Sequence, residues 1–229
     1  MNSNLTTCVH RSVMQRLFSR SMKALLPIGY FPPISYFSVL MQHKPVLEAK
    51  EHFVKQSLRN RCTILGANGP LNLLVPRVKV AERQTIDKSQ IHEETDWKTL
   101  HWRSLEAAYR NSPYFEYYED ELKPFFEKNH THHFQLAVDS IELVCNLLEI
   151  DFELEITTEY QVSPTQLDLR NTWNKREYGN APHVQEFPTY IQVFSDRQPF
   201  CPDLSILDLM FCEGPRAKDY ILDLKLREF

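Results

Sequence analysis

Three cations and an asparagine fall within seven residues of this chain, and they are its clearest candidates for binding chemistry. The set is Lys55, Arg59, Asn60 and Arg61. Lys55 and Arg59 would share one face of a helix, whereas Arg59 and Arg61 would share one face of a strand. In either geometry two cations point the same way, and arginine forks bind phosphate or carboxylate through paired hydrogen bonds. The segment therefore predicts a site for an anionic small molecule, such as a nucleotide sugar or an acyl phosphate.

The same charges have a second interpretation, in which they only stabilise the fold. Glu48 and Glu51 precede them by a few residues, and ion-pair networks are ordinary features of folded proteins. In the first interpretation the three cations neutralise a phosphate or a carboxylate, and Asn60 orients it. The sequence leaves both interpretations open.

Two histidines are candidates for a general base that takes a proton from an attacking amine or hydroxyl, His52 and His101. His101 lies on the apolar stripe of a predicted helix, where a buried structural histidine is the commoner case. Asp208 could orient such a histidine. Its spacing from Ser205 also fits a helix-capping pair, which is the commoner role.

A long polar stretch, residues 161–187, is broken by two prolines and a glycine. Loops of this length inside a domain are usually functional or disordered. The candidate ligand contacts in this loop are Asp168, Arg170 and Lys175.

A β-hairpin is predicted directly after the cations, and it would position them. Asn68-Gly69 separates two apolar runs, and Asn-Gly is the strongest short-range hairpin signal because both residues accept positive φ. Pro70 then begins the return strand, where no ladder donor is needed. The hairpin would fix where the arginine side chains point.

A βαβ unit is predicted before the cations. Residues 25–28 and 45–48 resemble short buried strands, and residues 34–42 between them resemble a helix with Pro33 at its start. In open α/β sheets, ligands collect beyond the carboxyl ends of strands, beside helix N-termini that attract anions. Tyr30 lies in this turn, where it would stack on a flat ligand or pack the turn.

The remainder of the chain alternates predicted helices and strands. The helices are expected at residues 96–111 with Asp96 as N-cap, after Ser112-Pro113, at 132–150, at 203–211 before Gly214-Pro215, and at 215–226. Strands are expected at 152–160 and 189–194. The pattern predicts a single α/β domain with a mixed sheet packed by several helices.

Bulk properties exclude several classes of function. The 229 residues suit one domain with a sizeable core, and the net charge of −4 argues against non-specific nucleic-acid binding. Five cysteines without C-x-x-C spacing indicate neither a zinc knuckle nor a complete disulfide set, which is typical of a reducing compartment. The common glycine-rich phosphate loops and the H-E-x-x-H motif are absent. We therefore predict no metal site, and the sequence leaves any cofactor open.

The first 47 residues contain no Asp or Glu and include an uncharged run from Ala24 to His43. Pro27, Pro32 and Pro33 would break a spanning helix, so membrane insertion is not expected. Residues 1–21 are predicted to be an N-terminal extension, either disordered or not translated, ahead of a domain at 22–229.

Four motifs in order give the chain a resemblance to a known family. They are Tyr30-Phe31-Pro32-Pro33-Ile34-Ser35-Tyr36-Phe37, Lys55-Gln56-Ser57-Leu58-Arg59-Asn60-Arg61-Cys62-Thr63-Ile64, Asn111-Ser112-Pro113-Tyr114-Phe115-Glu116-Tyr117-Tyr118 and Pro202-Asp203-Leu204-Ser205-Ile206-Leu207-Asp208-Leu209 with Gly214-Pro215. Together they resemble the WbqC-like family from about Lys23 to Ile221. The resemblance implies a bacterial cytoplasmic protein of O-antigen or other surface-polysaccharide synthesis. It also implies a glycine or amino-acid transferase role, and it supplies no established catalytic residue.

The chain departs from the family pattern just before the basic motif. Many family members carry an acidic pair there, where this chain has Ala49-Lys50. Glu48 and Glu51 flank the gap and could take the place of that pair. Any activity that depends on the acidic pair is in doubt here.

The leading hypothesis is a cytosolic transferase acting on an activated anionic small molecule, such as a nucleotide-linked amino sugar. The alternative is a non-enzymatic module that binds an anionic metabolite or a partner protein. Nucleotidyl transfer is weaker, because the paired histidines such enzymes usually place in the first turn are missing. Neither nucleic acid nor a membrane is an expected partner, and the oligomeric state stays open.

Overall fold

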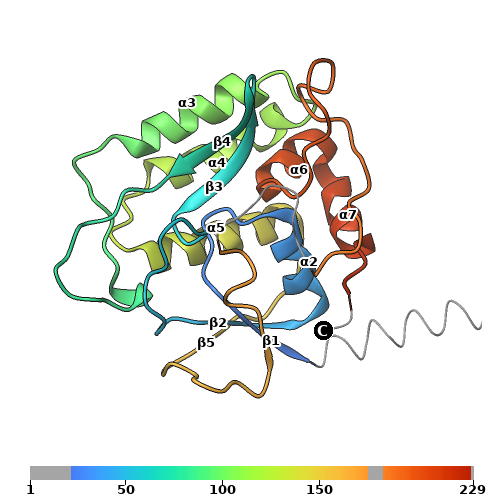
Figure 1. The fold of residues 1–229 in the computed structure, drawn as a ribbon. Helices are drawn as coiled ribbons and strands as arrows, with labels where there is room; N and C mark the ends of the chain where they lie inside the picture. The colour runs from blue at the N-terminus through green and yellow to red at the C-terminus, as the bar shows by residue number, and fades with distance from the viewer. Residues whose placement is uncertain (1–21, 175–182, 228–229) are drawn as a thin grey trace, which may run out of the picture.

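The structure is a computed structural model that describes residues 22–174 and 183–227. It confirms the predicted single α/β domain, with a four-stranded parallel sheet, a separate two-stranded hairpin and packed helices (Figure 1). The predicted extension at residues 1–21 and the candidate Lys175 lie outside the described residues.

The chain opens with the predicted βαβ unit. β1 (Lys23–Leu26) leads into α2 (Ile34–Gln42) and then β2 (Lys44–Leu47), and β1 pairs with β2 in parallel with Leu25 opposite Val46. Two short strands complete the sheet, β5 (Glu155–Ile156) beside β2 and β6 (Leu167–Asp168) beside β1, also in parallel. The strand order is therefore β5-β2-β1-β6, and all four carboxyl ends share one edge.

The hairpin of β3 (Arg61–Gly66) and β4 (Gly69–Leu74) forms where it is predicted, but its turn lies one residue earlier. The two turn residues are Ala67 and Asn68, and Gly69, at φ 110°, is the first residue of β4. It does not join the parallel sheet. The outward-facing groups of β3 bond instead to helix ends: the Thr63 carbonyl accepts from the Ser205 N–H, and the Leu65 N–H donates to the Tyr109 hydroxyl. The parallel and antiparallel parts are therefore two sheets rather than one mixed sheet.

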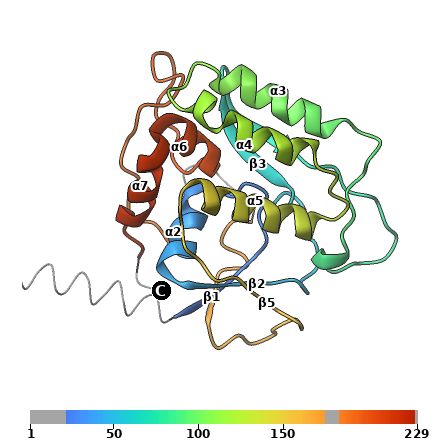
Figure 2. The same cartoon turned by 180° about the vertical axis from the view of Figure 1, so that it is seen from behind.

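The helices separate the two sheets, as both views of the ribbon show (Figures 1 and 2). The parallel sheet lies at the bottom, α2 and α5 (His133–Leu147) lie above it, and α3 (Trp97–Tyr109) and α4 (Phe115–Glu127) lie at the top beside the hairpin. The Asp96 carboxylate caps α3, as predicted, by accepting from the Thr99 N–H at 3.3 Å. One hydrophobic core runs through all these layers.

The C-terminal helices close one side of the molecule. α6 (Ile206–Glu213) begins at Ser205, whose hydroxyl accepts from the Leu207 N–H, and ends at Gly214. The one-turn 3-10 helix η2 (Gly214–Arg216) and α7 (Ala217–Asp223) follow. The final helix is thus shorter than the predicted span of 215–226.

Two predicted strands are wrong in extent or in kind. Of residues 152–160 only Glu155–Ile156 is a strand, because its partner β2 ends at Leu47 and leaves the following backbone without a neighbour. Residues 189–194 form no strand. The Gln192 side chain exchanges hydrogen bonds with the backbone of Cys201, so side-chain bonds replace a ladder.

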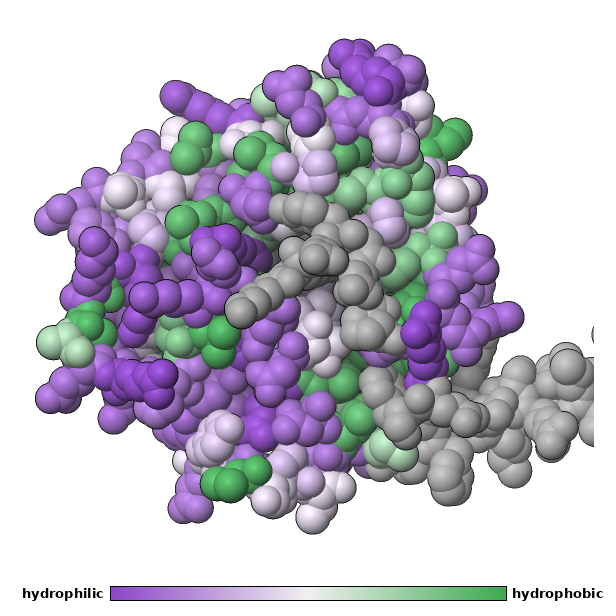
Figure 3. All heavy atoms as spheres, viewed as in Figure 1, coloured by the Kyte–Doolittle hydropathy of each residue, from purple (hydrophilic) through white to green (hydrophobic). Residues whose placement is uncertain are grey.

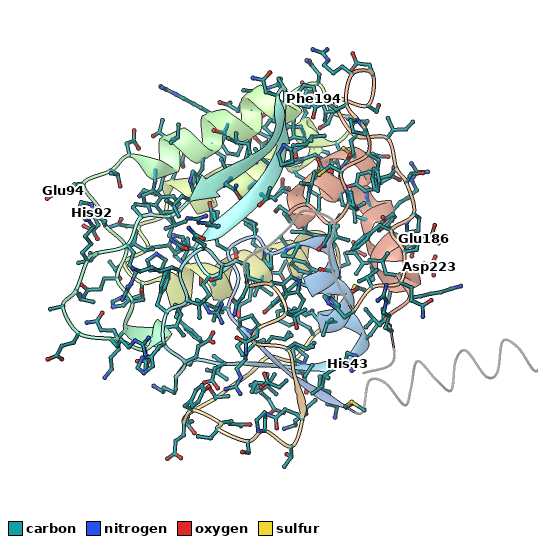
Figure 4. All side chains as sticks on the ribbon, viewed as in Figure 1. His43, His92, Glu94, Glu186, Phe194 and Asp223 are labelled. Atoms are coloured by element: carbon teal, nitrogen blue, oxygen red, sulfur yellow. The ribbon has the colours of Figure 1, made fainter. Side chains whose placement is uncertain are left out.

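The connector between the hairpin and α3 is exposed in part and buried in part. His92 and Glu94 lie at its outer rim, where their side chains are 3.8 Å apart (Figure 4). Ile86, in the short 3-10 helix η1 (Ile86–Lys88), and Ile91 are buried instead. Thr85 also bridges to the backbone of His52, which ties this connector to the segment after β2.

Candidate functional site

Charged and polar side chains gather where the parallel strands end. Glu48 directly follows β2, Thr157 directly follows β5, and Asp168 ends β6. Ligands of open α/β proteins bind at this edge of the sheet. The carboxyl-edge cluster, defined as Glu48, Glu51, Arg59, Asp168 and Arg170, is the candidate site.

Arg59 is the centre of the cluster and is wholly buried. Its Nε and one terminal nitrogen donate to the two carboxylate oxygens of Glu51 at 2.8 and 2.6 Å. The same guanidinium donates to the Arg170 carbonyl at 3.1 Å and to the Asn174 side chain at 2.8 Å. Arg59 therefore joins the segment after β2 to the segment after β6.

Glu48 and Arg170 form the second half of the cluster. One Glu48 oxygen accepts from the Thr157 hydroxyl at 2.7 Å and from the Lys50 N–H at 2.8 Å. The other oxygen accepts from Arg170 at 3.3 Å. Arg170 donates in addition to both oxygens of Asp168, at 2.9 and 2.7 Å.

Burial and ion pairing oppose each other in this cluster. Burial raises the pKa of Glu51, and the hydrogen bond and charge of Arg59 lower it. The hydrogen bond from Arg170 lowers the pKa of Asp168 below its ordinary value. Taking ions out of water costs several kcal/mol each, so well-packed apolar residues often stabilise a fold as much or more. Stability alone therefore gives little reason for this cluster.

Lys55 and His52, both predicted site residues, lie on the surface of the same segment. Lys55 has no ion pair within the described part of the chain. It stands at the tip of a turn in which Gln56 adopts φ 58° and the Ser57 hydroxyl donates to the Val54 carbonyl. Ser57 also bridges to Asn174, so the turn is fixed against the segment after β6.

Arg61 and Asn60 are separated from Arg59 by the start of the hairpin. Arg61 is the first residue of β3 and is partly exposed, and its buried Nε has no hydrogen-bond partner within the described residues. Asn60 is buried, and its side chain donates to the Val75 carbonyl at 2.8 Å. Arg59 precedes the strand, so the shared strand face predicted for Arg59 and Arg61 does not form.

His101 and Tyr30 bond to each other inside the core. The Tyr30 hydroxyl lies 3.0 Å from His101 Nδ1, and His101 Nε2 lies 3.2 Å from the Leu74 carbonyl. A carbonyl only accepts, so we assign the proton to Nε2 and let the tyrosine donate to Nδ1. Burial lowers the pKa of His101 to about 4. Tyr30 and His101 therefore both form hydrogen bonds within the protein, and the Tyr30 ring packs the turn.

Within the described residues, the Asp208 side chain neither caps α6 nor contacts a histidine. Its carboxylate is fully buried and accepts from Tyr109 at 2.7 Å, Tyr190 at 2.5 Å and Gln192 at 2.9 Å. Burial raises its pKa, and these three hydrogen bonds lower it. The predicted capping pair is therefore half right: the Ser205 hydroxyl caps α6, but the Asp208 carboxylate takes no part because tertiary donors occupy it.

The turn between β1 and α2, predicted to attract anions, already holds one. The Asp203 carboxylate accepts from the Ser35 N–H at 2.8 Å and from the Ser35 hydroxyl at 3.0 Å. A carboxylate of the chain itself therefore occupies the N-terminus of α2.

The cluster also contacts Thr157, Asn174 and Tyr160. None of these three residues was predicted from the sequence as part of the site. The sequence did indicate Arg170 and Asp168, because both fall in a long loop, but no local pattern indicated their partners.

Within residues 22–174 and 183–227 no group of three His, Cys, Asp or Glu side chains could hold a metal ion. Over the same residues, no helix is long and apolar enough to span a membrane.

Comparison with known proteins adds a family match. A family model described as the WbqC-like protein family matches residues 29–187, a range that contains the whole carboxyl-edge cluster. An uncharacterized protein of Mycobacterium tuberculosis (strain ATCC 25618 / H37Rv), Rv1507c, is 26% identical over 224 residues, covering 86% of this chain and 96% of that protein. No solved structure matches the chain.

Proposed function

Since the chain belongs to the WbqC-like protein family, we propose that it is a transferase acting on an activated, anionic small molecule at the carboxyl edge of its parallel sheet. The finer form of the proposal is transfer of an aminoacyl group, such as glycyl, to a nucleotide-linked amino sugar. That reaction would belong to cytosolic O-antigen or other surface-polysaccharide synthesis.

The carboxyl-edge cluster is the observation that carries the proposal. It brings together four buried charges, those of Glu48, Glu51, Arg59 and Arg170, at the edge where open α/β proteins bind ligands. Removing charges from water is costly. A function at this edge explains why the chain retains them, and perturbed buried charges are typical of functional sites.

The geometry divides the predicted site residues into two roles. Lys55 is exposed and Arg61 is partly exposed, and neither forms an ion pair within the described residues, so we assign them to the anionic group of the substrate. Arg59 and Asn60 act through protein contacts and position the segments that carry the site. His52 is exposed beside Glu51 and is the candidate general base, because His101 is buried with both ring nitrogens bonded.

A thermal-shift screen of the full chain tests the proposal. The ligands are nucleotide sugars, free amino acids, ATP and acyl phosphates. A ligand that binds only the folded state adds about 2.7 kcal/mol of stability at a hundredfold excess over Kd. Lys55→Ala is the informative variant, since Lys55 is exposed and its loss leaves no buried charge. Lys225→Ala, at another exposed lysine beyond α7, is the matched control.

A shift with a nucleotide sugar that disappears in Lys55→Ala and persists in Lys225→Ala would support the proposal. His52→Gln should then keep binding and lose transfer of an amino acid from its activated form to the amino sugar. Saturable binding without turnover in the wild type would instead indicate the non-enzymatic module. A folded chain that shifts with none of these anions would overturn the proposal.

A further inference from the structure

Tyr160 stands over the carboxyl-edge cluster and plays no part in its hydrogen bonds. It lies in the segment after β5, and its side chain is 50% exposed although it is large and aromatic. The Arg170 guanidinium lies 4.7 Å from the centre of its ring. One face of the ring is therefore in contact with a cation, and half of the residue's surface remains exposed.

The cation under the ring is held rigidly. Both oxygens of Asp168 accept from Arg170, Glu48 accepts from its third nitrogen, and the Arg170 side chain is buried. A guanidinium held at three nitrogens stays in place, and its attraction for the ring favours the observed orientation of Tyr160. The ring thus offers a flat surface at the edge of the proposed site.

The segment that carries Tyr160 exposes other apolar side chains as well. Ile156 and Val162, from the same segment, are 47% and 82% exposed. Hydrophobic groups are visible at the lower rim of the space-filling view, where Figure 1 places the loop between β5 and β6 (Figure 3). A flat ligand ring would match an exposed aromatic side chain in such a segment.

We propose that Tyr160 is the stacking platform for the nucleobase of a nucleotide-linked substrate. The inference rests on the proposed function, because it places that substrate at the same edge. Every nucleobase presents a π-face to an aromatic side chain, so the free part of the Tyr160 ring suits any of them. With the base on Tyr160, the sugar and phosphate would extend along the same edge of the sheet.

A second exposed tyrosine shows what an ordinary surface aromatic looks like in this fold. Tyr117 on α4 is 65% exposed, and its ring contacts the edge of Tyr118 rather than a buried cation. It lies on a helix at the other end of the molecule from the parallel sheet. Tyr117→Ala is therefore the matched control for Tyr160→Ala.

Isothermal titration calorimetry on the full chain tests the platform. The ligands are UMP, CMP, AMP and GMP, together with N-acetylglucosamine 1-phosphate, which has a phosphate and a sugar but no base. Tyr160→Ala should weaken binding of the preferred nucleotide about ten- to a hundredfold. Tyr160→Phe should stay near the wild type, and Tyr117→Ala should change nothing. Far-UV circular dichroism and the unfolding midpoint verify that each variant is folded.

The outcomes separate this inference from the proposed function. Unchanged nucleotide affinity in Tyr160→Ala would overturn the platform and leave the transferase proposal standing. An equal loss for N-acetylglucosamine 1-phosphate would overturn the assignment to the base, since a sugar would then be the stacked group. If no nucleotide binds while another anion gives a Lys55-dependent thermal shift, only the platform fails. If no anion binds at all, both proposals fail.

Discussion

A buried arginine and an exposed lysine four residues apart have different tasks in this chain. Arg59 directs its hydrogen bonds to Glu51, Asn174 and the Arg170 carbonyl, whereas Lys55 is exposed at a fixed turn. Residue type alone does not distinguish them. The difference is the tertiary environment, because a buried cation must find an anion of its own chain.

The Arg59–Glu51 pair gives a prediction at the scale of the residue. Arg59→Met should reduce the free energy of unfolding at pH 7 by about 3–5 kcal/mol, because it leaves the Glu51 carboxylate buried without its partner. Burial already raises the pKa of Glu51, and loss of Arg59 removes the effects that lower it. The folded state would then bind a proton more tightly than the unfolded state does. The deficit should therefore shrink as the pH falls from 7 towards 5. Urea unfolding at both pH values measures it.

The double variant Arg59→Met with Glu51→Leu is the control. Removing both charges should recover most of the loss and abolish its pH dependence, since the unpaired Glu51 carboxylate is gone. A deficit below about 1 kcal/mol in the single variant, or one equal at pH 5 and pH 7, would contradict this account.

At the scale of the element, α6 shows how a helix end can be fixed by tertiary packing. Gly214 ends the helix at φ 59°, in the left-handed region that glycine adopts without strain. A Cβ added to Gly214 would lie 2.4–2.6 Å from ring atoms of Tyr114. Position 214 therefore requires glycine for two independent reasons, the positive φ and the closeness of the Tyr114 ring.

Gly214→Ala should reduce the free energy of unfolding by about 2–4 kcal/mol, from the φ strain and the overlap together. Gly69→Ala is the comparison, because Gly69 also has positive φ but nothing lies within 4 Å of the position that its Cβ would take. Gly69→Ala should reduce the free energy of unfolding by less than Gly214→Ala does, since only backbone strain contributes. Urea unfolding of both variants measures the difference, and equal losses would rule out the Tyr114 contact as a cause.

At the scale of the whole molecule, buried histidines connect elements that are distant in sequence. His101 on α3 bonds to Tyr30 after β1 and to Leu74 at the end of the hairpin. His133 at the start of α5 contacts Ser89 near η1 at 3.2 Å. Each is neutral at pH 7, because burial lowers the pKa of both to about 4.

These two buried histidines predict that the free energy of unfolding decreases in acid. The folded pKa of each lies below the ordinary value of 6.5. The unfolded state therefore takes up protons first, and stability that is complete above pH 6.5 is lost as the pH falls towards 4. Each histidine should contribute a loss of up to about 3 kcal/mol, taking 1.36 kcal/mol per pKa unit. Urea unfolding from pH 7 to pH 4 measures the sum.

Nuclear magnetic resonance of the imidazole rings tests whether these two histidines cause the loss of stability in acid. Both rings should remain neutral at pH 5.5 in the folded chain, with the proton of His101 on Nε2. A titration midpoint near 6.5 for either ring would contradict its assignment as a buried neutral group.

The features that could be predicted from the sequence are those that short-range chemistry decides. Asn68-Gly69 indicated the hairpin to within one residue, because Gly69 takes the positive φ that the reversal needs, and Asp96 specified the start of α3. Pro33 and Ser112-Pro113 likewise placed the starts of α2 and α4 close to their observed positions. These signals are read within a few residues, so no tertiary knowledge was needed.

Which charges are available to a ligand became clear only from the folded chain. The partners of Arg59 after β6 lie 111 and 115 residues away, and the donors to Asp208 include one 99 residues distant. The false strand at 189–194 fails for the same reason, since its bonds go to groups that local patterning does not contain. A charge acts on a ligand only when no group of its own chain has neutralised it. That outcome depends on which loops the parallel sheet brings to its carboxyl edge, and no local pattern encodes this arrangement.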